Sequence, residues 1–80
     1  MTKQQIKQSF LNYFDRKLNS IIKSEEMNCY YVSGTDSREL LGAINYAWHT
    51  DIITDKENET LRKIVYEHLT EAERKLHHSL

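Results

Sequence analysis

Two helical patterns joined by a five-residue corner constrain this chain more than any other feature. The corner covers residues 50–54, and Thr54-Asp55-Lys56-Glu57 at its end has the spacing of a capping box. In a capping box the threonine hydroxyl accepts the amide of the residue three positions later, and the glutamate carboxylate accepts the amide of the threonine. A helix is therefore predicted to begin here and to cover about residues 55–77.

Both segments beside the corner are amphipathic. The apolar residues of segment 55–77 fall within an arc of roughly 140°, which is the width of one buried face. The segment before the corner, about 37–49, has a similar arc and opens with the capping sequence Asp36-Ser37-Arg38-Glu39. Ile52 and Ile53 are too apolar for a free loop and are expected to close the end of the pair. Two antiparallel helices joined this tightly form an αα-hairpin.

A third helix is predicted over about residues 3–23. Thr2 and Gln5 form a capping box at its start, and large apolar residues then recur every four positions. These are Ile6, Phe10, Phe14, Leu18 and Ile22. With their neighbours they span roughly 180°, wider than the ~100° stripe that one packed side requires. Two interpretations stay open: a three-helix core covers the whole arc, or one edge packs on the hairpin and the other meets a second copy or another protein.

Helical periodicity stops between residues 24 and 35. Cys29-Tyr30-Tyr31-Val32-Ser33 has high strand propensity and is followed by Gly34. We expect an irregular or extended Tyr-rich connection, either packed over the hairpin or forming an edge strand that pairs with a second copy. The predicted fold class is mainly α: one three-helix domain over residues 1–80, with a long N-terminal helix packed on a C-terminal αα-hairpin.

Composition limits the function classes. The net charge is −1, but residues 1–23 carry +4 and residues 24–80 carry −5, so the two parts are expected to attract each other. No apolar run approaches the ~18 residues of a membrane span, and no signal peptide is recognisable. A single cysteine fits a reducing compartment, so we expect a cytoplasmic protein. Residue types with A/T-rich codons are frequent, which hints at a low-GC bacterium or its phages.

The sequence contains no strong catalytic or metal-binding motif. His68 lies within the apolar arc of the last helix, where a hydrogen-bonded histidine at the core edge is the expected interpretation and a ligand-contacting imidazole the alternative. Neither Cys-x-x-Cys nor His-Glu-x-x-His occurs. Cys29 is not accompanied by a recognisable base. We therefore expect no catalytic residue, no cofactor and no metal.

Nucleic-acid binding is the alternative function, through basic residues of the N-terminal helix. These are Lys3, Lys7, Arg16, Lys17 and Lys23. They scatter around the helix, whereas nucleic-acid-binding domains usually gather their basic residues on one face. The acidic remainder of the chain would also repel phosphate.

The sequence best fits a non-catalytic regulatory or inhibitory protein that binds a protein partner through helical surfaces, and that forms a homodimer. Small proteins of phages and mobile elements often act in this way. The predicted protein-binding residues are aromatic or long cationic side chains that lie off the main apolar arcs, as is typical of interface centres. They are Tyr13, Lys17, Tyr30, Tyr31, Tyr46 and Tyr66.

Overall fold

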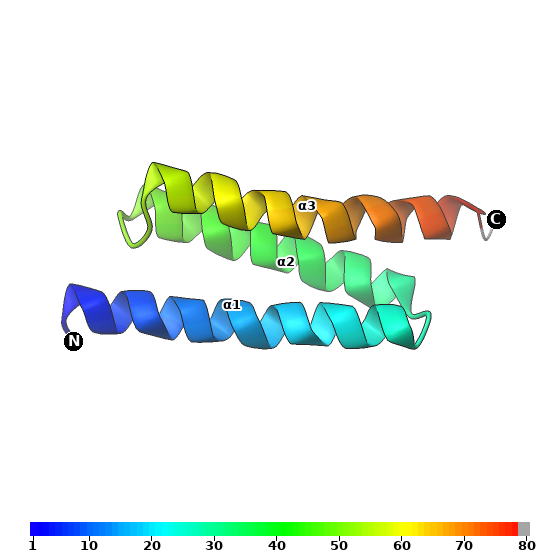
Figure 1. Ribbon diagram of the computed structural model, residues 1–80, viewed down its shortest axis with the longest axis horizontal. Helices are drawn as coiled ribbons and strands as arrows, with labels where there is room; N and C mark the ends of the chain where they lie inside the picture. Colours follow the sequence, from blue (N-terminus) through cyan, green and yellow to red (C-terminus); the bar gives the residue numbers. More distant parts are fainter. Residues whose placement is uncertain (79–80) are drawn as a thin grey trace.

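The computed structural model describes residues 1–78 and consists of three helices (Figure 1). They are α1 (Lys3–Glu26), α2 (Tyr30–His49) and α3 (Asp55–His78). Successive helices run antiparallel, so α1 and α3 point the same way, and α2 lies behind them in the view of Figure 1. The predicted fold, a long N-terminal helix on a C-terminal αα-hairpin, is confirmed.

The predicted helix starts of α1 and α3 are confirmed in detail. The Thr2 hydroxyl accepts the Gln5 amide at 3.1 Å, and the Gln5 side chain accepts the Thr2 amide at 2.8 Å. The Thr54 hydroxyl accepts the Glu57 amide at 3.1 Å, and the Glu57 carboxylate accepts the Thr54 amide at 2.9 Å. Each box satisfies two amides that a helix N-terminus would otherwise leave unpaired.

The helix ends of α1 and α2 share one motif, with a non-glycine residue in the left-handed region. Asn28 and Asp51 both have φ of 60°. The amide of the next residue bonds back to the helix in each case, from Cys29 to Ser24 at 2.7 Å and from Ile52 to Ala47 at 2.8 Å. This is the Schellman pattern, in which asparagine and aspartate tolerate the left-handed conformation better than most residues.

The predicted extended connection over residues 24–35 is wrong. Helix α1 continues to Glu26 and α2 begins at Tyr30, so the connection between them is only Met27-Asn28-Cys29. Asp36 is consequently a residue inside α2 and caps nothing. Tertiary packing overrides local strand propensity here, because Ser33, Gly34 and Ser37 are all buried.

Small residues let α2 and α3 approach closely. A Cβ atom added at Gly34 would lie 3.7 Å from the Ala72 Cβ, which is ordinary van der Waals contact. The Ser37 hydroxyl donates to the Ser33 carbonyl at 2.8 Å, whereas the Ser33 hydroxyl is buried without a partner in residues 1–78.

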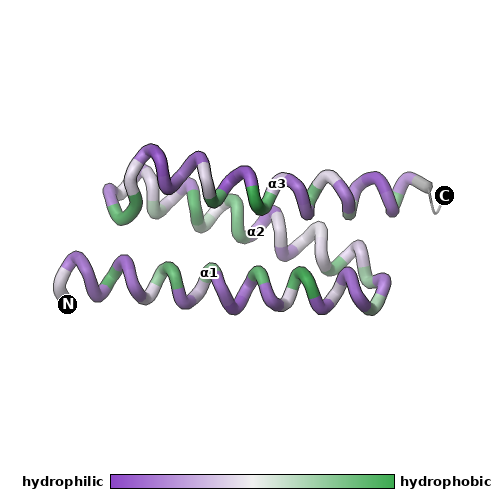
Figure 2. Tube along the Cα trace, viewed as in Figure 1, coloured by the Kyte–Doolittle hydropathy of each residue, from purple (hydrophilic) through white to green (hydrophobic). Residues whose placement is uncertain are grey.

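One apolar core joins the three helices, with most of its buried residues on α2 and α3. The buried apolar residues are Phe14, Ile21, Leu40, Ile44, Ala47, Ile53, Val65 and Ala72. Ile53 and the half-buried Ile52 close the end of the hairpin as predicted. Figure 2 shows this corner as hydrophobic, and it shows hydrophobic and hydrophilic positions alternating along α1 and α3. Within residues 1–78, no helix combines the length and apolarity needed to cross a bilayer.

Candidate functional site: the opening between α1 and α3

Helix α1 is held mainly by α2 and touches α3 little. Lys17 pairs with two carboxylates of α2, at 2.6 Å from Glu39 and 3.3 Å from Asp36. The Ser20 hydroxyl donates to Asp36 at 3.2 Å. Hydrogen bonding to Glu39 raises the pKa of Lys17, partial burial opposes the shift, and Asp36 adds to it. The ammonium group of Lys17 is therefore committed to fixing α1 on α2.

Two polar bridges link α1 to α3, one toward each end of α1. Lys7 Nζ lies 2.7 Å from Glu57 Oε2 and donates to Glu57 Oε1 at 2.9 Å. At the other end of α1, His68 Nδ1 lies 2.5 Å from Glu25 Oε1. The expectation that His68 is hydrogen-bonded at the core edge is confirmed, since its side chain is three-quarters buried. Side chains, and not close backbone packing, thus span the α1–α3 interface.

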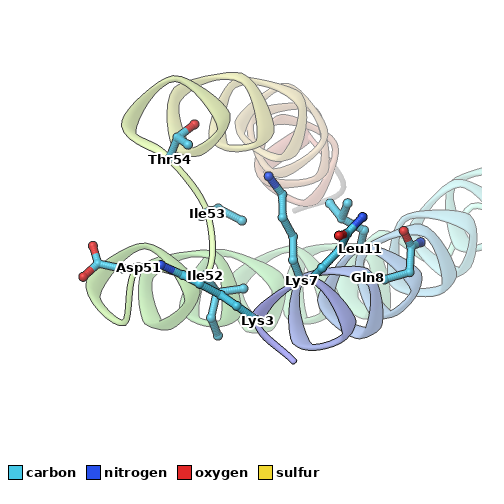
Figure 3. Close-up of a pocket in the computed structure, with 9 residues that line it drawn as sticks. Lys3, Lys7, Gln8, Leu11, Asp51, Ile52, Ile53 and Thr54 are labelled. Carbon is cyan, nitrogen blue, oxygen red and sulfur yellow. The ribbon is translucent and has the colours of Figure 1, made fainter. Parts of the chain in front are cut away.

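Beside the Lys7–Glu57 bridge the surface forms two hollows that share Leu11 and Thr54. The larger, about 680 Å³, lies between the start of α1 and the α2–α3 corner (Figure 3). The smaller, about 290 Å³, continues along α3 and is mainly apolar, with Leu61 and Thr60 in its lining. We call the two together the corner groove. Its apolar residues are Leu11, Ile52, Ile53 and Leu61.

Charges of both signs surround the corner groove. Lys3 and Lys7 extend from α1 toward the corner in Figure 3, Lys56 lies on the α3 side, and Asp51 and Glu57 are the acidic residues. The Lys7 ammonium holds the pKa of the Glu57 carboxyl below its ordinary value, and the Thr54 amide lowers it further. Lys7 and Glu57 neutralise each other, so Lys3 and Lys56 are the cations left to interact with a bound molecule.

The structure does not gather the six predicted protein-binding residues into one site. Lys17 is engaged in intramolecular ion pairs, and the partly buried Tyr13 packs against the core. Tyr30 is half-buried with the Lys75 ammonium 5.9 Å from its ring centroid. The three exposed ones are Tyr31, Tyr46 and Tyr66, at 75%, 68% and 47% exposure. None of the six lines the corner groove.

Sequence patterns missed the corner groove because its residues come from segments that are far apart in the chain. Leu11 and Leu61 look like ordinary members of two apolar arcs, and only their incomplete burial distinguishes them. Two features of the sequence indicate this region of the molecule. Lys7 interrupts the apolar arc of α1, and Ile52 is unusually apolar for a corner residue.

The described residues offer little that resembles a catalytic or metal centre. Cys29 is exposed, and its sulfur lies 3.7 Å from the Met27 carbonyl. Residues 1–78 contain no group of three histidine, cysteine or acidic side chains placed to hold a metal ion.

Comparison with protein-family models, with curated proteins and with solved structures finds no match to this chain.

Proposed function

We propose that this protein is a non-catalytic regulator or inhibitor that binds a protein partner in the corner groove. The observation that carries the proposal is the incomplete cover over α1. In the corner groove, Leu11 of α1 and Leu61 of α3 are only half-buried, which leaves apolar surface open between the two helices. Ile6 and Ile22, each 38% exposed, lie outside the lining of the groove. Apolar surface left open on a small domain is typical of interaction sites.

The shape of the corner groove favours a helical or extended segment of a protein. The two hollows are open to solvent and adjoin each other at Leu11 and Thr54, unlike the enclosed cavities that bury most of a small ligand. An amphipathic segment could place apolar side chains over Leu11 and Leu61, with acidic or polar groups near Lys3 and Lys56. This is the helix-in-groove mode of recognition, in which an apolar face supplies most of the affinity.

The nucleic-acid alternative has less support than protein binding. Of the five basic residues in α1, Lys7 and Lys17 are neutralised by carboxylates. A phosphate backbone would have to compete with these intramolecular ion pairs, which removes much of the electrostatic attraction that dominates such binding. Retention on a heparin column at low salt would favour this alternative.

We also propose that the protein works in the cytoplasm, as the single cysteine suggests, and that it is a homodimer. A phage or mobile-element origin in a low-GC bacterium would fit a small inhibitor of a host protein.

Site-specific photocrosslinking tests the corner groove as the partner site. A photoreactive amino acid is placed at Gln8 or Thr60, which line the two hollows and are exposed, and at Arg16 on the solvent face of α1 as the control. In lysate of a low-GC bacterium, Gln8 and Thr60 should give the same discrete adduct and Arg16 should not. Leu11→Gln should abolish the adduct while the far-UV circular dichroism spectrum stays helical. Equal labelling from Arg16, or adduct that survives Leu11→Gln, would contradict the proposal.

A further inference from the structure

The face of α2 that points away from α1 and α3 carries a continuous exposed stripe at helical spacing. Its residues are Tyr31, Thr35, Arg38, Gly42, Tyr46 and His49, all exposed. Because α2 lies behind the other two helices in Figure 1, this stripe and the opening between α1 and α3 are on opposite sides of the molecule. Asp51, which takes part in the dimer contact proposed below, also lines the corner groove, so a partner in the groove must leave its carboxylate to that contact.

Gly42 at the centre of the stripe has no packing role within the subunit. A Cβ atom added at Gly42 would meet nothing within 4 Å, whereas one at Gly34 would contact Ala72. A glycine inside an exposed helix costs roughly 1 kcal/mol relative to alanine. Its backbone is not in the left-handed region, so no turn requires it either. Gly42 therefore lowers helix stability without compensation inside the subunit, and it leaves a shallow depression on α2.

We infer that a second copy of this chain docks on the stripe, with the two α2 helices antiparallel. Tyr46 lies one turn beyond Gly42, and its side chain is 68% exposed. In an antiparallel pair centred between these two residues, Tyr46 of each copy fills the depression at Gly42 of the other. A two-fold axis makes each such contact occur twice, which is the defining property of an isologous interface.

Charges at the two ends of the docked segments favour this register. The same pairing sets Arg38 of one copy opposite the α2 end of the other, where Asp51 lies. Arg38 uses one nitrogen to bond Glu73 at 3.0 Å and keeps further donors exposed. Asp51 is exposed and makes no ion pair with any described residue. A parallel arrangement would instead bring the two Arg38 side chains together, which like-charge repulsion disfavours.

The docked segments from Arg38 to Asp51 overlap over about 20 Å of helix. Both corner grooves then face outward on opposite sides of the dimer. The dimer would present two copies of the proposed partner site, so a partner with two binding segments would bind with increased avidity. The dimer inference itself does not depend on the proposed function.

A charge-exchange experiment tests the register directly. Arg38→Glu and Asp51→Lys are made in separate chains. In each variant alone, both contacts of the dimer join like charges, so self-association measured by sedimentation equilibrium should weaken about tenfold or more. In an equimolar mixture both contacts join opposite charges, so a heterodimer should form with an affinity within about threefold of the wild type.

Lys63→Glu and Glu67→Lys on the solvent face of α3 are the matched controls, because they make the same charge changes at exposed positions. They should leave self-association unchanged. Gly42→Gln fills the depression with a good helix former and should also abolish the dimer. Because the space at Gly42 is open, this variant should remain folded by circular dichroism.

A wild-type chain that stays monomeric at high micromolar concentration would overturn the inference. So would a wild-type dimer that the Arg38, Asp51 and Gly42 variants do not weaken, or a mixture of the two charge variants that stays monomeric.

Discussion

The two interfaces that α3 makes with the rest of the molecule are built on different principles. Close backbone approach and buried side chains hold α3 against α2. Val65 and Ala72 are fully buried, and Ala72 faces Gly34. Against α1, the links are the Lys7–Glu57 and Glu25–His68 bridges, and the surface beside the first is hollowed. Buried apolar contacts are worth several times as much as partly exposed ion pairs. The hairpin is thus the rigid part, and the α1–α3 interface is the part that can accept a partner.

The largest effect is expected where a side chain is enlarged in the α2–α3 interface. Ala72→Leu has no room beside Gly34 and should lower the free energy of unfolding by about 2–3 kcal/mol. Thr60→Leu enlarges a side chain, by one heavy atom, in the smaller hollow of the corner groove, where space is open, and should change stability by less than about 0.5 kcal/mol. Urea denaturation measures both. Equal losses would mean that the two interfaces are packed alike.

A gain is expected at Ser33, whose hydroxyl is the one buried hydroxyl without a partner among residues 1–78. Ser33→Ala removes an unsatisfied polar atom and introduces a better helix former, so it should raise the free energy of unfolding by about 1 kcal/mol. Ser37→Ala is the control, because the Ser37 hydroxyl donates to the Ser33 carbonyl and its loss should bring no such gain. If Ser33→Ala destabilises the protein, the Ser33 hydroxyl has a partner in solution.

A smaller coupling is expected across the Glu25–His68 bridge. A double-mutant cycle with Glu25→Gln and His68→Gln should give a coupling free energy of about 0.5–1 kcal/mol near pH 6, because both side chains are three-quarters buried. The same cycle on Arg38 and Glu73, which are more exposed, should give less. A coupling free energy above about 3 kcal/mol would contradict this expectation, because it would mean that the Glu25–His68 pair contributes as much as a fully buried ion pair.

The smallest effect is expected at the Lys7–Glu57 bridge, and its pH dependence has a defined sign. Glutamine can replace glutamate in a capping box, so Glu57→Gln isolates the loss of charge. Since the folded-state pKa of Glu57 is lowered, the stabilisation exists above the unfolded-state pKa of about 4.3 and is lost as pH falls through the folded-state value. Wild type should exceed Glu57→Gln by about 0.5 kcal/mol near pH 7, and the difference should vanish in acid. A difference that grows in acid would contradict this assignment.

The sequence was informative where structure depends on local hydrogen bonding, and misleading where it depends on packing. Both capping boxes and the apolar corner follow from spacing alone. The first turns of α2 could not be predicted in this way. Their buried residues include Ser33 and Gly34, which faces Ala72, and serine and glycine are residue types that a search for apolar periodicity assigns to loops. Asn28 was the available signal for the end of α1, since asparagine often takes the left-handed position after a helix. Of the five tyrosines predicted to lie on the surface, Tyr31, Tyr46 and Tyr66 are exposed, whereas Tyr13 and Tyr30 are half-buried, because only the packing of the helices decides which edge of each apolar arc is covered.

Methyl-group NMR with a soluble paramagnetic probe tests the central contrast most directly. The probe broadens methyl resonances in proportion to their accessibility in the free protein. Leu11 and Leu61, in the corner groove, should be broadened strongly, and Leu40 and Val65, in the α2–α3 interface, should be protected. If Leu11 and Leu61 are protected as fully as Val65, α1 and α3 close on each other in solution, and the corner groove is not open to a partner.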